Sequence, residues 1–181
     1  MFLSIVTRTC RRPKALARCI RSLGAQDCQD FEHVIIVDEI GRGVAWANGM
    51  MAERDWSDLN GDYVYILDDD NKLFNGAISA MQNGVTNQND LLICKIQRLK
   101  RSQRSFPEDE YWQRKPVYCH IDIGCVVLRK DLFLQSVKSF TASYEGDYHF
   151  ISEAYQKAHS VNWVDYKIMA LQRISAGEFE I

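Results

Sequence analysis

Three consecutive aspartates follow an apolar run in the middle of the sequence. The run Tyr63–Leu67 has the β-branched and aromatic residues of a buried strand, and Asp68, Asp69, Asp70 and Asn71 come directly after it. Adjacent carboxylates repel one another, so they are stable together only where a cation or several hydrogen-bond donors lie among them. The pattern predicts a polar ligand or cation site at the end of a central strand, with a solvated acidic turn as the alternative.

Two other apolar runs also end at polar residues. Phe31–Val37 ends at Asp38, and Phe2–Val6 is followed by the segment Thr7–Thr9 with Arg8 at its centre. In a parallel α/β sheet, ligands bind where the strands reach their carboxyl ends. We therefore expect hydroxyls, an arginine and carboxylates from three strands to open into one crevice.

Helical and extended patterns alternate along the chain. Apolar residues recur with helical spacing between Pro13 and Gly24, and this helix joins the first two strands. A βαβ crossover of this kind implies parallel strands, so the sequence predicts an α/β fold with a mostly parallel central sheet flanked by helices. Further helices are expected at 43–54 and 130–137, and two more are expected to begin at the N-cap Asn75 and at residue 144. Strands are expected at 90–96, 121–128 and 161–171, and an irregular loop at about 97–118.

Composition limits the class of protein. A length of 181 residues allows one well-packed core, so a single domain over residues 1–181 is expected. The formal net charge of −2 argues against nucleic acid or an anionic membrane as the main partner. No apolar run is long enough to span a membrane, and polar residues begin at Thr7, too early for a signal peptide. The six cysteines lack zinc-site spacing, which indicates reduced thiols in a cytoplasmic protein.

The acidic residues suit one type of reaction. A divalent cation held by one or two carboxylates, such as Asp68 and Asp70, neutralises a diphosphate leaving group. A single displacement at a sugar carbon also needs a base that accepts the proton of the acceptor hydroxyl. Asp147 is a candidate for that base, because it lies in the first turn of the helix expected from residue 144. The plainer interpretation is an ordinary acidic residue at a helix start.

The order of several short motifs resembles the GT-A fold glycosyltransferases of family two, which are inverting enzymes that use nucleotide-diphosphate sugars. The resemblance covers nearly the whole chain and implies a single minimal GT-A (Rossmann-like) catalytic domain. The motifs are Ser4–Thr7 with Arg12-Pro13, Val37-Asp38, Asn48-Gly49, Gly61–Val64, the Asp-x-Asp motif at Asp68–Asp70, Gly124 with Arg129-Lys130, and Gly146-Asp147.

The resemblance implies roles for individual residues. Asp147 is expected as the catalytic base and Asp70, with Asp68, as the ligand of Mg²⁺ or Mn²⁺. Arg42 is expected at the nucleotide base or the diphosphate. The full set expected to bind the nucleotide sugar is Thr7, Arg8, Asp38, Arg42, Asn48, Asp68 and Asp69, and the set expected at the sugar or acceptor is His120, Asp122 and Glu145.

The sequence also departs from the family pattern and leaves alternatives open. Segment 39–43 is shorter than usual, and Gly146 stands where an acid normally precedes the base, which makes Glu145 a rival to Asp147. Trp46 and Trp112 could stack on a sugar or base, with the core as the expected place for Trp46. The expected partners are a UDP- or GDP-sugar, a glycan, lipid-linked or protein acceptor, and a second copy or a partner subunit. The alternatives are a non-catalytic nucleotide-sugar-binding domain and a phosphatase or phosphotransferase with an aspartate nucleophile.

Overall fold

A computed structural model of the chain describes residues 1–98 and 104–171. The strands are β1 (Leu3–Thr9), β2 (Phe31–Val37), β3 (Tyr63–Ile66), β4 (Lys72–Leu73), β5 (Leu91–Arg98), β6 (Ser105–Phe106), β7 (Val126–Arg129) and β8 (Val161–Leu171). The α-helices are α1 (Pro13–Gly24), α2 (Val44–Glu53), α3 (Ala77–Gly84), α4 (Lys130–Ser136) and α5 (Gly146–Lys157). Short 3₁₀ turns are η1 (Asp109–Tyr111), η2 (Ile123–Cys125) and η3 (Val137–Ser139).

The strands form one sheet in the order β2-β1-β3-β7-β5-β8-β4, with β6 paired to β5. Strand β1 is parallel to β2 and β3, and β5 is parallel to β8. Strand β7 is antiparallel to both β3 and β5, so these two run in the same direction. The parallel strands of the sheet are therefore β1, β2, β3, β5 and β8. The short strands β4 and β6 are antiparallel to their neighbours β8 and β5. The prediction of an α/β fold with a mostly parallel sheet is therefore confirmed, and β3 is a central strand as expected.

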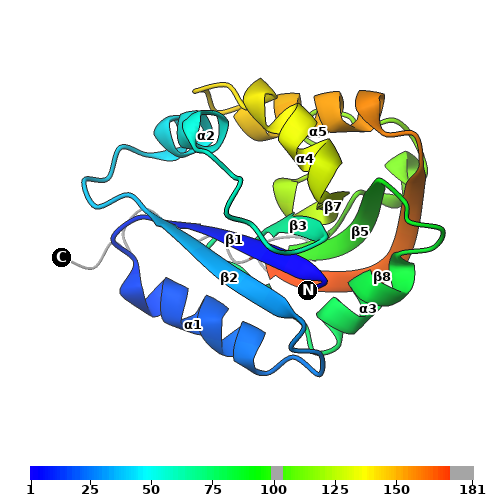
Figure 1. Cartoon of the computed structure of the whole chain (residues 1–181), viewed down its shortest axis with the longest axis horizontal. Coiled ribbons are helices and arrows are strands. Elements are labelled where there is room, and N and C mark those ends of the chain that lie inside the picture. Colours follow the sequence, from blue (N-terminus) through cyan, green and yellow to red (C-terminus); the bar gives the residue numbers. More distant parts are fainter. Residues whose placement is uncertain (99–103, 172–181) are drawn as a thin grey trace.

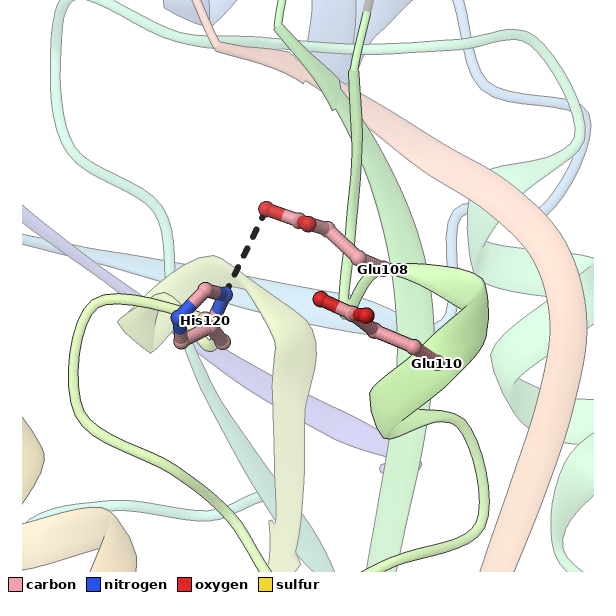
Figure 2. Close-up of side chains that lie close together, drawn as sticks. All are labelled: Glu108, Glu110 and His120. Atoms are coloured by element: carbon pink, nitrogen blue, oxygen red, sulfur yellow. Dashed lines mark ion pairs between the residues drawn. The ribbon is translucent and has the colours of Figure 1, made fainter.

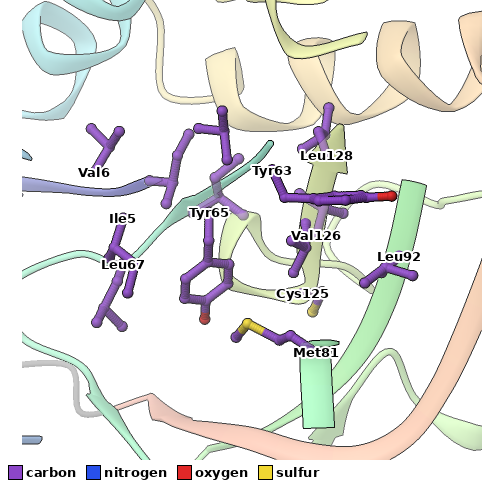
Figure 3. Close-up of a cluster of buried hydrophobic side chains, with 14 of the residues drawn as sticks. Ile5, Val6, Tyr63, Tyr65, Leu67, Met81, Leu92, Cys125, Val126 and Leu128 are labelled. Carbon is purple, nitrogen blue, oxygen red and sulfur yellow. The ribbon is translucent and has the colours of Figure 1, made fainter. Parts of the chain in front are cut away.

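Helices cover both faces of this sheet (Figure 1): α1 and α3 lie on one face, and α2, α4 and α5 on the other. Successive side chains of a strand point to opposite faces of the sheet, so buried side chains lie on both faces (Figure 3). Ile5 and its cross-strand neighbour Tyr65 point toward Met81 of α3, whereas Val6 and Leu128 point to the opposite face. All five side chains are almost completely buried, so β1, β3 and β7 form a rigid base for the loops at their ends.

Gly61 allows β3 to enter the sheet close to β1. A Cβ atom at this position would lie 2.3 Å from the backbone nitrogen of Ser4 and 2.6 Å from the carbonyl carbon of Leu3. The Gly61 amide also donates a 2.8 Å hydrogen bond to the Ser4 hydroxyl. Only glycine fits here, and the close approach fixes the register of β3 beside β1.

Two local predictions are wrong. Helix α3 begins at Ala77 after Gly76, which has a positive φ of 78°, so Asn75 is not its N-cap. The strand predicted for 121–128 begins only at Val126, because the Asp122 carboxylate accepts a 3.0 Å hydrogen bond from the Gly124 amide and closes the turn η2. The loop predicted at 97–118 is irregular apart from the end of β5, strand β6 and turn η1, with residues 99–103 outside the described residues.

Among the described helices, none combines the length and the apolar character that crossing a membrane requires.

Candidate active site

The ends of three parallel strands meet at one edge of the sheet, as the sequence predicts. The amide of Leu67, after β3, donates to the carbonyl of Val6 on β1 at 2.9 Å, and the amide of Asp38, after β2, donates to the carbonyl of Thr9 at 2.8 Å. Strand β1 runs three residues beyond its apolar part, to Thr9. Arg8 therefore lies within the strand and between the two neighbouring strand ends.

Arg8 is hydrogen-bonded to three other predicted site residues. Its guanidinium donates two hydrogen bonds to Asp68, both at 2.8 Å, one to the Asn48 side chain at 2.6 Å and one to Asp147 at 3.0 Å. The arginine side chain is only 8% exposed. Asn48 is also buried and donates to the carbonyl of Ser143 at 2.9 Å. This network links β1, α2, the loop after β3 and the start of α5.

Asp69 is neutralised inside the protein by a second arginine. Its carboxylate is fully buried, accepts a 2.6 Å hydrogen bond from the Thr9 hydroxyl and forms an ion pair with Arg12. Burial nevertheless raises the pKa of Asp69 above its usual value. The predicted cation among the three aspartates is thus supplied in part by Arg8 and Arg12, and Asp69 lines neither of the clefts described below.

Asp70 differs from its two neighbours because its carboxylate faces a cleft with a weaker partner. The closest approach of Arg12 to Asp70 is 3.5 Å. Burial, followed by the negative charge of Asp68, raises the pKa of Asp70 to about 7. The Asp70 side chain is 18% exposed, and a largely buried carboxylate surrounded by like charges is a suitable ligand for a divalent cation, because the cation relieves the repulsion. Asp68, with both oxygens bonded to Arg8, has fewer lone pairs left for such a role.

Asp38 organises the short segment that follows β2. Its oxygens accept hydrogen bonds from the backbone amides of Ile40, Gly41, Arg42 and Gly43, at 2.5 to 3.3 Å. Burial alone would raise the pKa of Asp38, but these hydrogen bonds outweigh it and the pKa lies below its usual value. The shortened segment is therefore a structured wall of the site.

Trp46 lies against the segment after β2 and at a cleft, and not in the core where it was expected. The Arg42 guanidinium carbon lies 3.5 Å from the centre of the Trp46 ring, and Trp46 lines a cleft instead of the core. Thr7, by contrast, is fully buried and shares a 2.8 Å hydrogen bond with His33 Nε2. Thr7 is not among the residues that line the clefts.

Gly146 explains how α5 brings Asp147 to the site. A Cβ atom on Gly146 would lie 2.3 Å from the Thr141 carbonyl oxygen and 2.7 Å from Asn48 Nδ2, so only glycine lets the helix start this close to α2. Burial raises the pKa of Asp147, and Asp68 adds to this, while Arg8 favours the ionised form. The departure from the family pattern at this position is thus a packing requirement.

Glu145 and Asp122 lie on the same cleft as Asp147, whereas His120 does not. Figure 2 shows His120 beside Glu108 and Glu110 of the η1 region. His120 Nδ1 lies 3.5 Å from Glu108, and one ligand-type atom of each residue lies within 4.8 Å of the others. These three side chains form a second group that is suited to a cation, separate from Asp70.

Two clefts adjoin at this edge of the sheet. The first, of about 480 Å³, is lined by the segment Arg8–Arg12, which contains three arginines, and by Asp38, Gly43 and Trp46. The second, of about 630 Å³, is lined by Asp70, Asp122, Glu145 and Asp147 and by three tyrosines. Both clefts share Asp68 and Val44. The tyrosines and Arg12 were not predicted as site residues, although Tyr144 and Tyr148 flank the motif Glu145-Gly146-Asp147 directly.

Comparisons with known proteins identify the fold. No protein-family model matches the sequence, and no curated protein matches it either. Solved structures do match. S. aureus TarS 1-349 has a TM-score of 0.69 and 15% identity over 95% of this chain and 60% of its own. The same TarS fragment has been solved in complex with UDP and with UDP-GlcNAc.

Two further structures have the same fold. The mannosyltransferase PcManGT from Pyrobaculum calidifontis, solved with GDP-Man and Mn²⁺, has a TM-score of 0.64 and 13% identity over 97% of this chain and 58% of its own. A197 from STIV has a TM-score of 0.54 and 15% identity, covering 91% of this chain and 82% of its own. This chain spans about 60% of the length of the TarS fragment. The similarity of the structures confirms the predicted GT-A fold.

Proposed function

We propose that the chain is a glycosyltransferase that moves a sugar from a nucleotide-diphosphate sugar to an acceptor hydroxyl, with inversion at the sugar carbon. One observation carries this proposal. Asp70, from the loop after β3, and Asp147, from the start of α5, line the same cleft although they are far apart in the sequence. A single-displacement transfer needs these two functions at one place, a site that stabilises the diphosphate and a base for the acceptor.

The two clefts suit the two parts of such a donor. The first cleft offers Trp46 for a base or ribose and the basic segment Arg8–Arg12 for the diphosphate. The second cleft continues past Asp68 to Asp147 and is the place for the sugar and the acceptor. The donors in the TarS and PcManGT complexes support a UDP- or GDP-sugar as the ligand class. Asn48, Asp69 and Thr7 would then support this site from within the protein.

A divalent cation fits the environment of Asp70. The carboxyl group is largely buried, its pKa is raised to about 7, and Asp68 and Asp122 add negative charge around it. Asp70 would hold the Mg²⁺ or Mn²⁺, with Asp68 as a secondary ligand. When bound, the cation supplies positive charge that stabilises the leaving diphosphate.

Asp147 would act as the base. As the acceptor oxygen forms its bond to the sugar carbon, the bond from that carbon to the diphosphate oxygen breaks, and the electron pair leaves with the nucleoside diphosphate. The acceptor hydroxyl proton passes to an oxygen of Asp147. Burial makes Asp147 a stronger base than an exposed aspartate, because it raises the pKa, and Arg8 holds the carboxylate in place.

Donor turnover tests this proposal. We expect slow hydrolysis of a UDP- or GDP-sugar by the wild-type chain and a loss of about 10²- to 10⁴-fold in Asp147→Asn, with the affinity for the nucleotide retained. Glu145→Gln separates the two candidate bases: donor hydrolysis is kept if Asp147 is the base and lost if Glu145 is. Nucleotide binding without turnover in the wild type would indicate the non-catalytic binding domain. Phosphate release from simple phosphomonoesters, lost in Asp68→Asn, would indicate the phosphatase.

A further inference from the structure

Three tyrosines line the second cleft together with Asp147 and Glu145. Tyr118 precedes η2, Tyr144 lies in the turn before α5, and Tyr148 lies in the first turn of that helix. The rings of Tyr118 and Tyr148 meet edge to face, with their centres 5.3 Å apart. Two separate chain segments therefore build one aromatic wall.

This wall is not part of the hydrophobic core. Tyr118, Tyr144 and Tyr148 are absent from the buried core cluster, and Tyr144 and Tyr118 are 65% and 42% exposed. A single exposed tyrosine needs no explanation. Three tyrosines on one cleft, next to two carboxylates, offer flat apolar faces together with hydrogen-bonding groups, which is the composition of a ligand site.

The charge of the cleft restricts what the tyrosines can bind. The carboxylates among the described lining residues are Asp68, Asp70, Asp122, Glu145 and Asp147, and Arg98 is the cation found with them. Asp68 is compensated by Arg8, and Asp70 is the proposed cation ligand. Glu145 lies beside the tyrosine wall, with the Tyr118 hydroxyl 3.5 Å from its Oε1. A negatively charged acceptor would be repelled here, whereas neutral hydroxyl groups would find acceptors.

We infer that the acceptor is a neutral saccharide, which packs a sugar ring against Tyr144 and Tyr118 and donates hydroxyl hydrogen bonds to Glu145. A sugar ring combines an apolar C–H face with a rim of hydroxyls, so it matches an aromatic wall edged by a carboxylate. A long lipid alcohol would need a continuous apolar groove instead of this acidic cleft. The inference rests on the proposed function, because it assigns the acceptor of that reaction.

Direct binding tests the inference with the full chain. Saturation-transfer NMR and titration would use neutral tetrasaccharides of glucose, mannose and N-acetylglucosamine at millimolar concentration, with tetragalacturonate as the anionic comparison. We expect at least one neutral tetrasaccharide to bind and tetragalacturonate not to bind. Tyr144→Ala and Tyr118→Ala should each weaken that binding by about 3- to 10-fold. Tyr166→Ala is the matched control, since Tyr166 is 43% exposed on β8 and lines neither cleft.

Each outcome decides the inference. Binding of no neutral tetrasaccharide, preference for tetragalacturonate, or equal weakening by Tyr144→Ala and Tyr166→Ala would overturn it. Calorimetry with UDP and GDP separates this result from the proposed function. Nucleotide binding without saccharide binding rejects the acceptor assignment alone. Saccharide binding that depends on Tyr144, without nucleotide binding, rejects the transferase and leaves a saccharide site.

Discussion

Replacing Arg8 with glutamine should remove the guanidinium that joins Asp68, Asn48 and Asp147. The change eliminates two hydrogen bonds to Asp68 and one each to Asn48 and Asp147. It also leaves the two carboxylates close together without the positive charge between them. The expected result is a less stable protein and a base that is harder to ionise.

The size of the effect follows from burial. Removing one partner of a buried ion pair costs about 3–5 kcal/mol. Arg8 is 8% exposed, but Asp68 and Asp147 are 26% and 27% exposed, so water can solvate them in part. We therefore expect the lower end, a loss of about 3 kcal/mol in the free energy of unfolding. Arg8→Lys keeps the charge and loses the paired geometry, so it should cost only about 1–2 kcal/mol.

Urea unfolding of wild type, Arg8→Gln and Arg8→Lys measures these differences, with exposed Arg18→Gln on α1 as a control expected to stay within about 0.5 kcal/mol. Arg8 favours the ionised form of Asp147, so its removal should raise the pKa of Asp147 further. The acidic limb of the turnover profile should then move to higher pH. An Arg8→Gln protein as stable as the Arg18→Gln control would refute the role of Arg8 as the link between these segments.

Two further predictions concern β1 and its neighbours. Gly61→Ala should lower the free energy of unfolding by about 1–3 kcal/mol, because its Cβ would meet the Ser4 backbone at 2.3 Å. Gly24→Ala is the control and should cause no such loss, because the new Cβ would have open space around it. Equal urea midpoints for the two variants would contradict this prediction. Burial would raise the pKa of Glu32, but hydrogen bonds from Asn60 and Ser4 outweigh it and lower the pKa to about 2. The stability contributed by ionised Glu32 should therefore be complete above pH 4.5 and be lost as the pH falls toward 2. The difference in the free energy of unfolding between wild type and Glu32→Gln should close over that range. A difference that does not depend on pH would exclude this contribution.

Much of the fold was predictable from local patterns. The apolar run Tyr63–Leu67 indicates a buried strand because strands covered on both faces lack alternation. The helix from Pro13 to Gly24 has terminal residues typical of a helix start and end. The convergence of Asp38 with Asp68 follows from parallel strands, whose carboxyl ends lie at one edge of the sheet.

The site was less predictable, because its contacts depend on side chains that meet only in the folded chain. The apolar run of β1 stops at Val6, yet the strand continues through Arg8 because buried partners arrive from other segments. Nothing local indicates that Arg8 and Arg12 neutralise Asp68 and Asp69. Trp46 was expected in the core, but its position beside Arg42 depends on the segment that Asp38 holds in place.

We propose that Asp70 and the adjoining clefts bind a nucleoside diphosphate together with a divalent cation. Isothermal titration of UDP and GDP, with and without Mn²⁺, tests it most directly on wild type and Asp70→Ala, with exposed Asp165→Ala as the control. Mn²⁺ should strengthen nucleotide binding to wild type and Asp165→Ala and should have no effect on Asp70→Ala. Binding of neither nucleotide to the wild type, or the same Mn²⁺ dependence in Asp70→Ala, would contradict it.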